Sequence, residues 1–207
     1  MNVTVFPLGP LDTNCFVIHT QKEALVVDPG GPPDELLDFL QKNGLNLTHI
    51  LLSHLHFDHT YGVAELVRQT GAEVLGPEGD RYMLSNEMGL GGIWGLPGVE
   101  PYEYTVLEPG PLHVLDTECT VLATPGHTPG GLSFYFPALK AVFSGDTLFY
   151  RSIGRSDFPG GDQKSLEASI RQTLYGLPDE TVVYCGHGLQ TSIGDERRNN
   201  PYVSDFS

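Results

Sequence analysis

Hydrophobic and polar positions along the first fifty residues predict strands followed by a helix. Three short runs rich in β-branched and aromatic residues are separated by turn residues, as expected of β-strands. These runs are residues 3–6, 15–19 and 24–27. Residues 33–42 carry leucines at helical spacing and are followed by Gly44, which predicts an amphipathic helix with a glycine stop.

The rest of the chain continues to alternate between strand-like and helix-like patterns. Short apolar runs predict further strands at residues 49–52, 73–75, 112–115, 120–123, 132–136, 141–143 and 182–184. Helical spacing predicts helices at residues 64–69 and 165–175. This alternation indicates an α/β fold with helices outside the sheets. Because we find no repeat and no linker-like segment, we expect one domain spanning residues 1–207.

Residues 80–104 form the least regular part of the sequence. They are rich in glycine and carry, among other apolar and aromatic residues, Met83, Met88, Trp94, Tyr102 and Tyr104. A long loop of this kind can be a lid over a binding site, and it can equally cap the hydrophobic core. The sequence leaves its role open.

Composition and charge narrow the class of protein. Hydrophobic residues make up 40% and charged residues 18% of the chain, as in an ordinary globular protein. The 25 glycines and 16 prolines indicate many turns, which disfavours a helical bundle. The formal net charge of -15 disfavours nucleic acid and anionic membrane surfaces as partners, because affinity for phosphates comes mainly from Lys and Arg.

The amino-terminal residues and the cysteines bear on the compartment. Residues 1–10 lack the basic and apolar regions of a secretory signal, and no apolar run approaches the roughly 20 residues that span a bilayer. Cys15, Cys119 and Cys185 are widely spaced and odd in number, which argues against a disulfide framework and favours buried free thiols. We therefore expect a cytoplasmic protein.

The densest cluster of potential metal ligands follows the predicted strand at residues 49–52. It contains His54, His56, Asp58 and His59 within six positions. In an extended segment, residues two apart face the same side, so His54 and His56 can reach one ion. Once the chain turns toward the next helix, Asp58 and His59 can reach a second ion nearby. Imidazole and carboxylate groups are suitable ligands for zinc and iron.

Three further candidates lie in glycine-flanked turns after predicted strands. His127 lies in Thr-Pro-Gly-His-Thr-Pro-Gly, Asp146 in Phe-Ser-Gly-Asp and His187 in Cys-Gly-His-Gly. We expect these strand ends to converge on one sheet edge, where all seven candidate side chains would bind metal. The remaining histidines, for which we expect ordinary structural roles, are His19, His49 and His113.

These motifs resemble those of the metallo-β-lactamase superfamily. The H-x-H-x-D-H signature of that family is intact at residues 54–59, and the similarity extends from segment 26–30 to segment 186–188. The resemblance implies an αββα sandwich, with two mixed β-sheets and helices on the outer faces, and a dinuclear site. It also implies how the ligands are shared: one ion is held by His54, His56 and His127, the other by Asp58, His59 and His187, and Asp146 bridges the two.

This ligand set implies metal-assisted hydrolysis. Two ions beside one water lower its pKa from about 15.7 toward neutrality and produce a bridging hydroxide nucleophile. The ions can also polarise the scissile carbonyl group. Asp58 is the expected catalytic residue, because it would orient the nucleophile as well as bind metal. Zinc is our first expectation for the two divalent ions, and iron and manganese suit the same ligands.

Within the superfamily, the chain is most similar to short bacterial members of the glyoxalase II group. The similarity lies in Asp-Thr-Leu-Phe at residues 146–149, in residues 153–162 and in Glu-Arg-Arg-Asn-Asn-Pro at residues 196–201. That group hydrolyses glutathione thioesters such as S-lactoylglutathione, so the resemblance implies a small-molecule thioester substrate. Because the sequence ends soon after His187, we expect it to lack the helical carboxy-terminal domain that completes the glutathione pocket in longer members.

Arginines in the last third of the chain are candidates for substrate binding. Arg155 falls where glyoxalase II proteins carry a basic residue that contacts glutathione, and Arg151, Arg197 and Arg198 lie in the same part of the chain. A guanidinium group suits bidentate binding of a carboxylate, and glutathione has two. We select Arg155, Arg197 and Arg198 as substrate-binding candidates. Surface ion pairs with the many acidic residues are the alternative for each of them.

Two other functions stay open at this stage. Persulfide dioxygenases share a Gly-Arg-Thr-Asp-Phe-like segment and use a single iron, and a non-catalytic binding protein can have the same fold. The complete ligand set favours the hydrolase over both. The sequence does not fix the acyl group, the thiol or the oligomeric state, and it is compatible with a homo-oligomer.

Overall fold

The computed structural model describes residues 1–93 and 95–205 of the chain. Contacts within it divide the protein into two compact units. The first consists of Met1–Leu107 with Val114–Asp116, and the second of Glu108–His113 with Thr117–Ser207. Each unit is built around one six-stranded sheet, and the expectation of a single domain over residues 1–207 stays a prediction.

The first sheet is mixed and has the strand order β1-β2-β3-β4-β5-β6. Its strands are β1 (Asn2–Leu8), β2 (Thr13–His19), β3 (Glu23–Val27), β4 (Asn46–Leu51), β5 (Glu73–Gly76) and β6 (Thr105–Val106). The first three strands pair antiparallel, and β3, β4, β5 and β6 pair parallel. The predicted strands of the first unit are therefore confirmed, whereas the two-residue strand β6 is too short to produce a pattern in the sequence.

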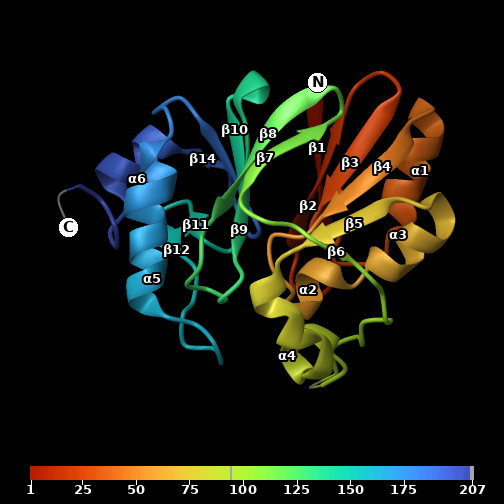
Figure 1. Cartoon of the computed structure of the whole chain (residues 1–207), viewed down its shortest axis with the longest axis horizontal. Coiled ribbons are helices and arrows are strands. Elements are labelled where there is room, and N and C mark those ends of the chain that lie inside the picture. Colours follow the sequence, from red (N-terminus) through yellow and green to blue (C-terminus); the bar gives the residue numbers. More distant parts are fainter. Residues whose placement is uncertain (94, 206–207) are drawn as a thin grey trace. The chain divides into compact units, whose positions relative to one another are not determined.

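Two helices, α1 (Asp34–Asn43) and α3 (Val63–Thr70), pack beside each other on one side of this sheet (Figure 1). Leu36 and Leu40 of α1 and Leu66 of α3 are buried in one cluster with side chains from the strands. This burial is the reason why the helical spacing of leucines predicts α1 correctly. Gly44 ends α1 in a left-handed conformation with φ 62°, which a residue with a side chain adopts at a cost.

The segment after β5 is more regular than its sequence suggests. A 3₁₀ helix at Glu78–Ser85 is followed by α4 (Glu87–Leu90), whose first turn is capped by the side chain of Asn86. Met83 is fully buried in the core of the first unit, and Tyr102 and Tyr104 pack against it. These contacts show that the segment covers the hydrophobic core of the first unit. A lid role for residues 80–104 stays a prediction. Trp94 lies outside the described residues.

The second sheet is also mixed and has the strand order β14-β13-β10-β9-β8-β7. Its strands are β7 (Gly110–Val114), β8 (Thr117–Ala123), β9 (Leu132–Phe136), β10 (Ala141–Gly145), β13 (Val182–Cys185) and β14 (Thr191–Ser192). A short hairpin of β11 (Leu148–Phe149) and β12 (Ser152–Ile153) follows β10. Strands β8 and β10 are each antiparallel to β9, and β13 is parallel to β10, so β8, β10 and β13 all end at the same edge of the sheet.

Helical segments of the second unit lie together on one side of its sheet (Figure 1). The helix predicted at residues 165–175 is composite: α5 (Gln163–Ala168) continues as one π turn at Ser169–Thr173 and ends in a 3₁₀ turn at Leu174–Gly176. Its buried residues Leu166, Ile170 and Leu174 face the core. The last helix, α6 (Ile193–Asn199), was not predicted, because only Ile193 among its side chains is apolar.

The remaining short helices are α2 (Phe57–Thr60) in the first unit and a 3₁₀ turn at Pro137–Leu139 in the second. Over residues 1–93 and 95–205, no helix combines the length and the apolar character needed to cross a membrane.

Candidate functional site

The first unit gathers four of the predicted ligands directly after strand β4. His54 and His56 follow the strand, and α2 then turns Asp58 and His59 back toward them. All four residues are almost completely buried, with exposed fractions of 2%, 5%, 6% and 0%. The ring centroid of His54 lies 4.7 Å from that of His56 and 4.0 Å from that of His59. The predicted cluster is therefore compact and largely shielded from water.

A hydrogen-bond chain that ends on Asp28 fixes the orientation of two of these imidazoles. The Asp28 carboxylate lies 3.0 Å from Nδ1 of His59 and accepts hydrogen bonds from the backbone N–H and the hydroxyl of Ser53, at 2.8 and 2.6 Å. The Ser53 hydroxyl has one hydrogen, which it donates to Asp28. At 3.0 Å from Nδ1 of His54 it can therefore only accept, so Nδ1 of His54 carries a proton.

The same reasoning applies to His59, because an ionised carboxylate can only accept. Protonated Nδ1 atoms leave Nε2 of both His54 and His59 as the basic nitrogen that can ligate a metal. Asp28, His54 and His59 offer polar atoms within 4.8 Å of one another, a spacing at which they could also share an ion. We assign Asp28 the orienting role, since both of its oxygens already accept hydrogen bonds.

Asp58 is held from two sides. Its Oδ2 accepts a hydrogen bond of 3.2 Å from the hydroxyl of Thr13 and lies 3.7 Å from Nε2 of His59. The backbone of Asp58 approaches Gly30 so closely that a Cβ on Gly30 would lie 1.7 Å from the Asp58 carbonyl oxygen. Only glycine fits there, so the Pro-Gly-Gly turn after β3 packs directly against the backbone of Asp58 and helps to fix its position.

The second unit brings together the other three predicted ligands at the edge where β8, β10 and β13 end. Oδ2 of Asp146 lies 3.6 Å from Nε2 of His127 and 3.6 Å from Nε2 of His187. The side chains of His127 and Asp146 are 7% and 12% exposed, whereas that of His187 is 30% exposed. One carboxylate oxygen equidistant from two imidazoles is the arrangement expected of a bridging ligand.

The orientation of His127 is fixed by a backbone group. Its Nδ1 lies 2.7 Å from the carbonyl oxygen of Arg155. A carbonyl oxygen can only accept, so Nδ1 is the donor and Nε2 is the ligating nitrogen. The ring of His127 also packs edge-on against Phe158, with centroids 6.4 Å apart.

Both residue sets fit a divalent metal by the chemistry of their donors. Imidazole nitrogens and carboxylate oxygens bind zinc, iron and manganese, and buried groups of this kind are stable only when paired or coordinated. Neighbouring ligands around a tetrahedral ion lie about 3.3 Å apart, given bonds of about 2.0–2.1 Å. The nitrogen-to-oxygen separations of 3.6 and 3.7 Å are close to that value. Histidine and aspartate groups in this protein could thus bind metal.

The three arginines selected as substrate-binding residues have different surroundings. Arg155 is exposed; its guanidinium pairs with the carboxylate of Asp157 at 2.9 and 2.8 Å and lies 4.1 Å from the ring centre of Phe158. Arg197 and Arg198, on α6, both pair with Asp179, at 2.9 and 3.4 Å. The ion pair with Asp157 lowers the pKa of that carboxyl group. A substrate role for these arginines stays a prediction.

The three cysteines are buried and free, as predicted. Burial raises the pKa of the Cys119 thiol to about 12 and that of the Cys185 thiol to about 11, and it raises the pKa of Cys15 as well. Thiols in this state are protonated near neutral pH and are poor nucleophiles. None of them is a candidate for covalent catalysis.

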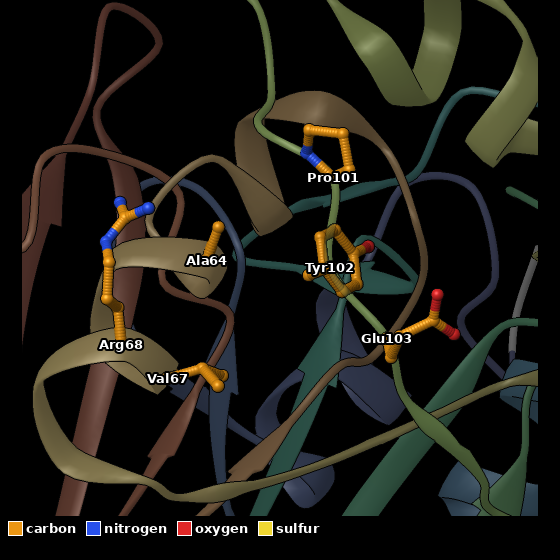
Figure 2. Close-up of a pocket in the computed structure, with 6 residues that line it drawn as sticks. All are labelled: Ala64, Val67, Arg68, Pro101, Tyr102 and Glu103. Atoms are coloured by element: carbon orange, nitrogen blue, oxygen red, sulfur yellow. The ribbon is translucent and has the colours of Figure 1, made fainter.

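A pocket also opens on the first unit, between α3 and the segment before β6 (Figure 2). Ala64, Val67 and Arg68 line one side, and residues 101–103 line the other. Its Arg68 pairs with Glu65 and with Glu100. Among the described residues that line it, none is a predicted ligand, so this pocket does not define the candidate site.

Sequence reasoning missed the residues that orient the ligands. The sequence assigns Asp28 no role beyond its place in segment 26–30, yet it contacts both Ser53 and His59. Its φ of 52° is a left-handed conformation that is uncommon for a non-glycine residue, and such outliers gather at functional sites. A buried aspartate at the end of an apolar strand was the signal that could have identified it. The contribution of Arg155 through its carbonyl group leaves no signal in the sequence.

A comparison with known protein families identifies the family of this chain. The family model described as "Metallo-beta-lactamase superfamily" matches residues 8–187. This match covers strands β2 to β13 and all seven predicted ligands. The chain belongs to the metallo-β-lactamase superfamily.

Three relatives illustrate the range of the family around this chain. A protein named hydroxyacylglutathione hydrolase GloC from Haemophilus influenzae is 35% identical over the full length of both chains. The crystal structure of BLEG-1 B3 metallo-beta-lactamase has a TM-score of 0.91 at 36% identity and covers 98% of this chain and 99% of its own. The structure of TTHA1623 in a di-iron-bound form has a TM-score of 0.87 at 40% identity and covers 97% and 100%.

These similarities confirm the predicted fold class, an α/β protein of the metallo-β-lactamase type with two mixed sheets and helices. They also place the chain in a superfamily of metallo-hydrolases, which supports an enzymatic function. The relative in a di-iron-bound form shows that a member with this fold binds two metal ions.

Proposed function

We propose that the protein is a dinuclear metallo-hydrolase that cleaves hydroxyacyl thioesters of glutathione, such as S-lactoylglutathione. The observation that carries this proposal is the fixed orientation of His54, His59 and His127, each held through Nδ1 so that Nε2 is the ligating atom. Similarity to a protein named hydroxyacylglutathione hydrolase over the full length of both chains supports the substrate class.

The proposal assigns the ligands as the family resemblance implies. His54, His56 and His127 would hold one ion, Asp58, His59 and His187 would hold the other, and Asp146 would bind both. Zinc is the first candidate for both positions, and the di-iron form of one relative makes iron the next.

Divalent ions bound to these residues would supply Lewis acidity for the thioester carbonyl and acidify a water molecule toward neutral pH. The hydroxyl of Thr13 holds the carboxylate of Asp58 in place, so that Asp58 would accept a hydrogen bond from the attacking water and orient it. Asp28 and Ser53 keep His54 and His59 in one tautomer throughout the reaction. A thiolate is a good leaving group, since the pKa of an ordinary thiol is only about 8.5, so we propose no protein acid for its release.

We further propose that Arg155 binds a carboxylate of the glutathione portion. Its guanidinium is exposed and planar against Phe158, and Phe158 contacts the ring of His127. A substrate carboxylate would replace Asp157 as the partner of Arg155. This exchange costs little free energy, because an exposed ion pair contributes only roughly 0–1 kcal/mol to stability.

The test combines metal analysis with turnover. Purified protein is stripped with a chelator, reconstituted with zinc or with iron, and assayed for thiol release from S-lactoylglutathione. We expect about two ions per chain, no turnover in the stripped protein and restored turnover on reconstitution. Turnover that persists without metal contradicts the proposal, and so does one iron per chain with oxygen consumption on glutathione persulfide, which defines a dioxygenase.

One observation favours a second candidate, hydrolysis of β-lactams. The structure of a protein named as a B3 metallo-beta-lactamase matches this chain with a TM-score of 0.91 at 36% identity. A chromogenic cephalosporin measured beside the thioester, on the same metal-loaded sample, separates the two activities. We expect the specificity constant for the thioester to be the larger one, and the reverse order would assign the protein to β-lactam hydrolysis.

A further inference from the structure

Glu196 is a buried carboxylate nine residues after His187, the last of the predicted ligands. Its side chain is completely buried, on a helix whose other acidic residue in the first turn, Asp195, is partly exposed. An isolated carboxylate in this position would be strongly destabilising. The hydrogen-bond partners of Glu196 therefore indicate its structural role.

Those partners converge on the hairpin formed by β11 and β12. The carboxylate of Glu196 accepts hydrogen bonds from the backbone N–H of Arg151 at 2.9 Å and from its guanidinium at 2.6 Å. Thr191 donates to it at 2.7 Å, and the Nδ2 group of Asn200 donates at 2.9 Å. The same Nδ2 group also donates to the carbonyl oxygen of Ser152 at 3.0 Å. Glu196 and Asn200 thus hold Arg151 at the tip of the hairpin and Ser152, the first residue of β12.

The turn at that tip depends on this support. Arg151 has a φ of 55°, a left-handed conformation that is unfavourable for a residue with a side chain. Burial of its backbone hydrogen bond and its ion pair against Glu196 offsets this cost. Without the carboxylate, we expect the tip to relax to another conformation.

The two ends of the hairpin lead to the two groups that set the geometry of His127. Asp146, whose Oδ2 lies 3.6 Å from Nε2 of His127, comes two residues before β11. Arg155, whose carbonyl oxygen binds Nδ1 of His127, comes two residues after β12. A hydrogen bond of 3.2 Å from Gly154 to the carbonyl oxygen of Thr147 closes the base of the hairpin. If the tip of the hairpin moves, we therefore expect both Asp146 and the Arg155 carbonyl, on the two sides of the His127 imidazole, to move with it.

We propose that Glu196, assisted by Asn200, is a positioning residue for the metal site: it holds the 148–153 hairpin so that Asp146 and the Arg155 carbonyl fix His127 in its ligating orientation. This inference rests on the proposed metal site. From the sequence, the Glu-Arg-Arg-Asn-Asn-Pro segment is a candidate for substrate binding only through its arginines. Its buried residues Glu196 and Asn200 have another role in this inference, because they connect to the ligands through the hairpin.

The experiment measures zinc affinity of the metal-free protein by competition with a chromophoric chelator, so that turnover is not required. Glu196→Gln places an amide NH₂ against the donors of Arg151, and we expect zinc affinity to fall by about tenfold, as for other groups behind metal ligands. The matched control is Asp195→Asn, which removes the other ion pair of the Arg151 guanidinium but touches neither backbone group of the hairpin. We expect its zinc affinity to equal that of the unchanged protein.

Circular dichroism and urea unfolding of the metal-free variants separate positioning from loss of fold. If Glu196→Gln does not fold, Asn200→Ala takes its place, because it removes the hydrogen bond to Ser152 and keeps the Glu196–Arg151 pair. A folded variant of either kind with unchanged zinc affinity overturns the inference, as does an equal loss in Asp195→Asn. An unchanged protein that binds zinc and cleaves no thioester contradicts the proposed substrate alone.

Discussion

Nδ1 of His59 lies 3.0 Å from Oδ2 of Asp28, a residue 31 positions earlier in the chain. The contact connects the turn after β3 to helix α2 and makes Nδ1 of His59 the protonated nitrogen. Because Asp28 also accepts two hydrogen bonds from Ser53, one carboxylate determines the tautomers of two predicted ligands. A metal site in this protein therefore depends on a residue that does not itself bind the ion.

Replacing Asp28 by Asn tests this dependence. Asparagine keeps only one of the two acceptor oxygens, so its NH₂ group must face either the backbone N–H of Ser53 or the Ser53 hydroxyl together with Nδ1 of His59. The first arrangement loses the backbone hydrogen bond, and the second favours the wrong tautomer of His59. We expect metal affinity to fall by about 10–100-fold with the fold retained. Zinc titration and circular dichroism measure the two effects. Asp38→Asn, at an exposed position on α1, is the control and should bind zinc like the unchanged protein.

Asp58→Asn should abolish turnover more completely than it weakens metal binding. The amide keeps one oxygen as a weak ligand but is a poor acceptor for the hydrogen of the nucleophile. We expect kcat to fall by roughly 10³-fold or more, within the range seen when a catalytic acid or base is lost. The assay must use samples with verified metal content. Near-normal kcat in a fully loaded variant would remove Asp58 from the mechanism.

Gly30→Ala should disrupt the first unit locally. The new Cβ would lie 1.7 Å from the carbonyl oxygen of Asp58, which forces the β3 turn and α2 apart. We expect a loss of about 3 kcal/mol in the free energy of unfolding, typical of severe overpacking, together with weaker metal binding. Gly176→Ala is the matched control, since a Cβ there meets no atom within 4 Å. Equal urea midpoints for the two variants would contradict this prediction.

Arg155→Ala separates the two functions of that residue. The backbone carbonyl that holds His127 is retained, so metal affinity should not change. Loss of the guanidinium removes the proposed contact with a substrate carboxylate, and we expect KM to rise by about tenfold while kcat is nearly kept, since a hydrogen bond to a charged group contributes about 1.5–3 kcal/mol. An unchanged KM for a glutathione thioester would show that Arg155 serves only its ion pair with Asp157.

Alkaline pH should destabilise the protein partly through Cys119. Burial raises the pKa of this thiol in the folded state from its usual value near 9 to about 12. The folded state therefore holds the proton more tightly, and the stabilisation from this group is fully present below pH 9 and is lost as the pH rises toward 12. Cys119→Ala should show a smaller fall in the free energy of unfolding between pH 8 and pH 11, measured in urea. An identical slope would exclude the thiol as the cause.

Elements and candidate ligands are easiest to predict from the sequence where a single physical role explains why a residue type occurs at that position. Leu36 and Leu40 are at helical spacing because they are buried, and the histidines of the 54–59 cluster follow a strand end because metal binding requires it. Helix α6 gave no such pattern, since Ile193 is its only apolar side chain and its other large buried side chain is the polar Glu196.

The orienting groups were harder to predict for a physical reason. Asp28 stands in an Asp-Pro-Gly-Gly turn, and turn formation alone accounts for an aspartate there. The carbonyl of Arg155 is common to every residue, so its hydrogen bond to His127 is visible only in three dimensions. Likewise, the pairing of Arg197 and Arg198 with Asp179 depends on the approach of two segments that are distant in the sequence.

The ion pairs of the arginines affect how a charged ligand arrives. Ion pairs with carboxylates of the chain itself are formed by Arg68, Arg81, Arg151, Arg155, Arg197 and Arg198. An anion diffusing in from solvent consequently experiences mainly the repulsion of the excess acidic groups. Added salt shortens the screening length, from about 30 Å at 0.01 M to about 10 Å at 0.1 M. For an anionic thioester, the association rate should therefore increase with ionic strength, the opposite of the behaviour of an electrostatically steered enzyme.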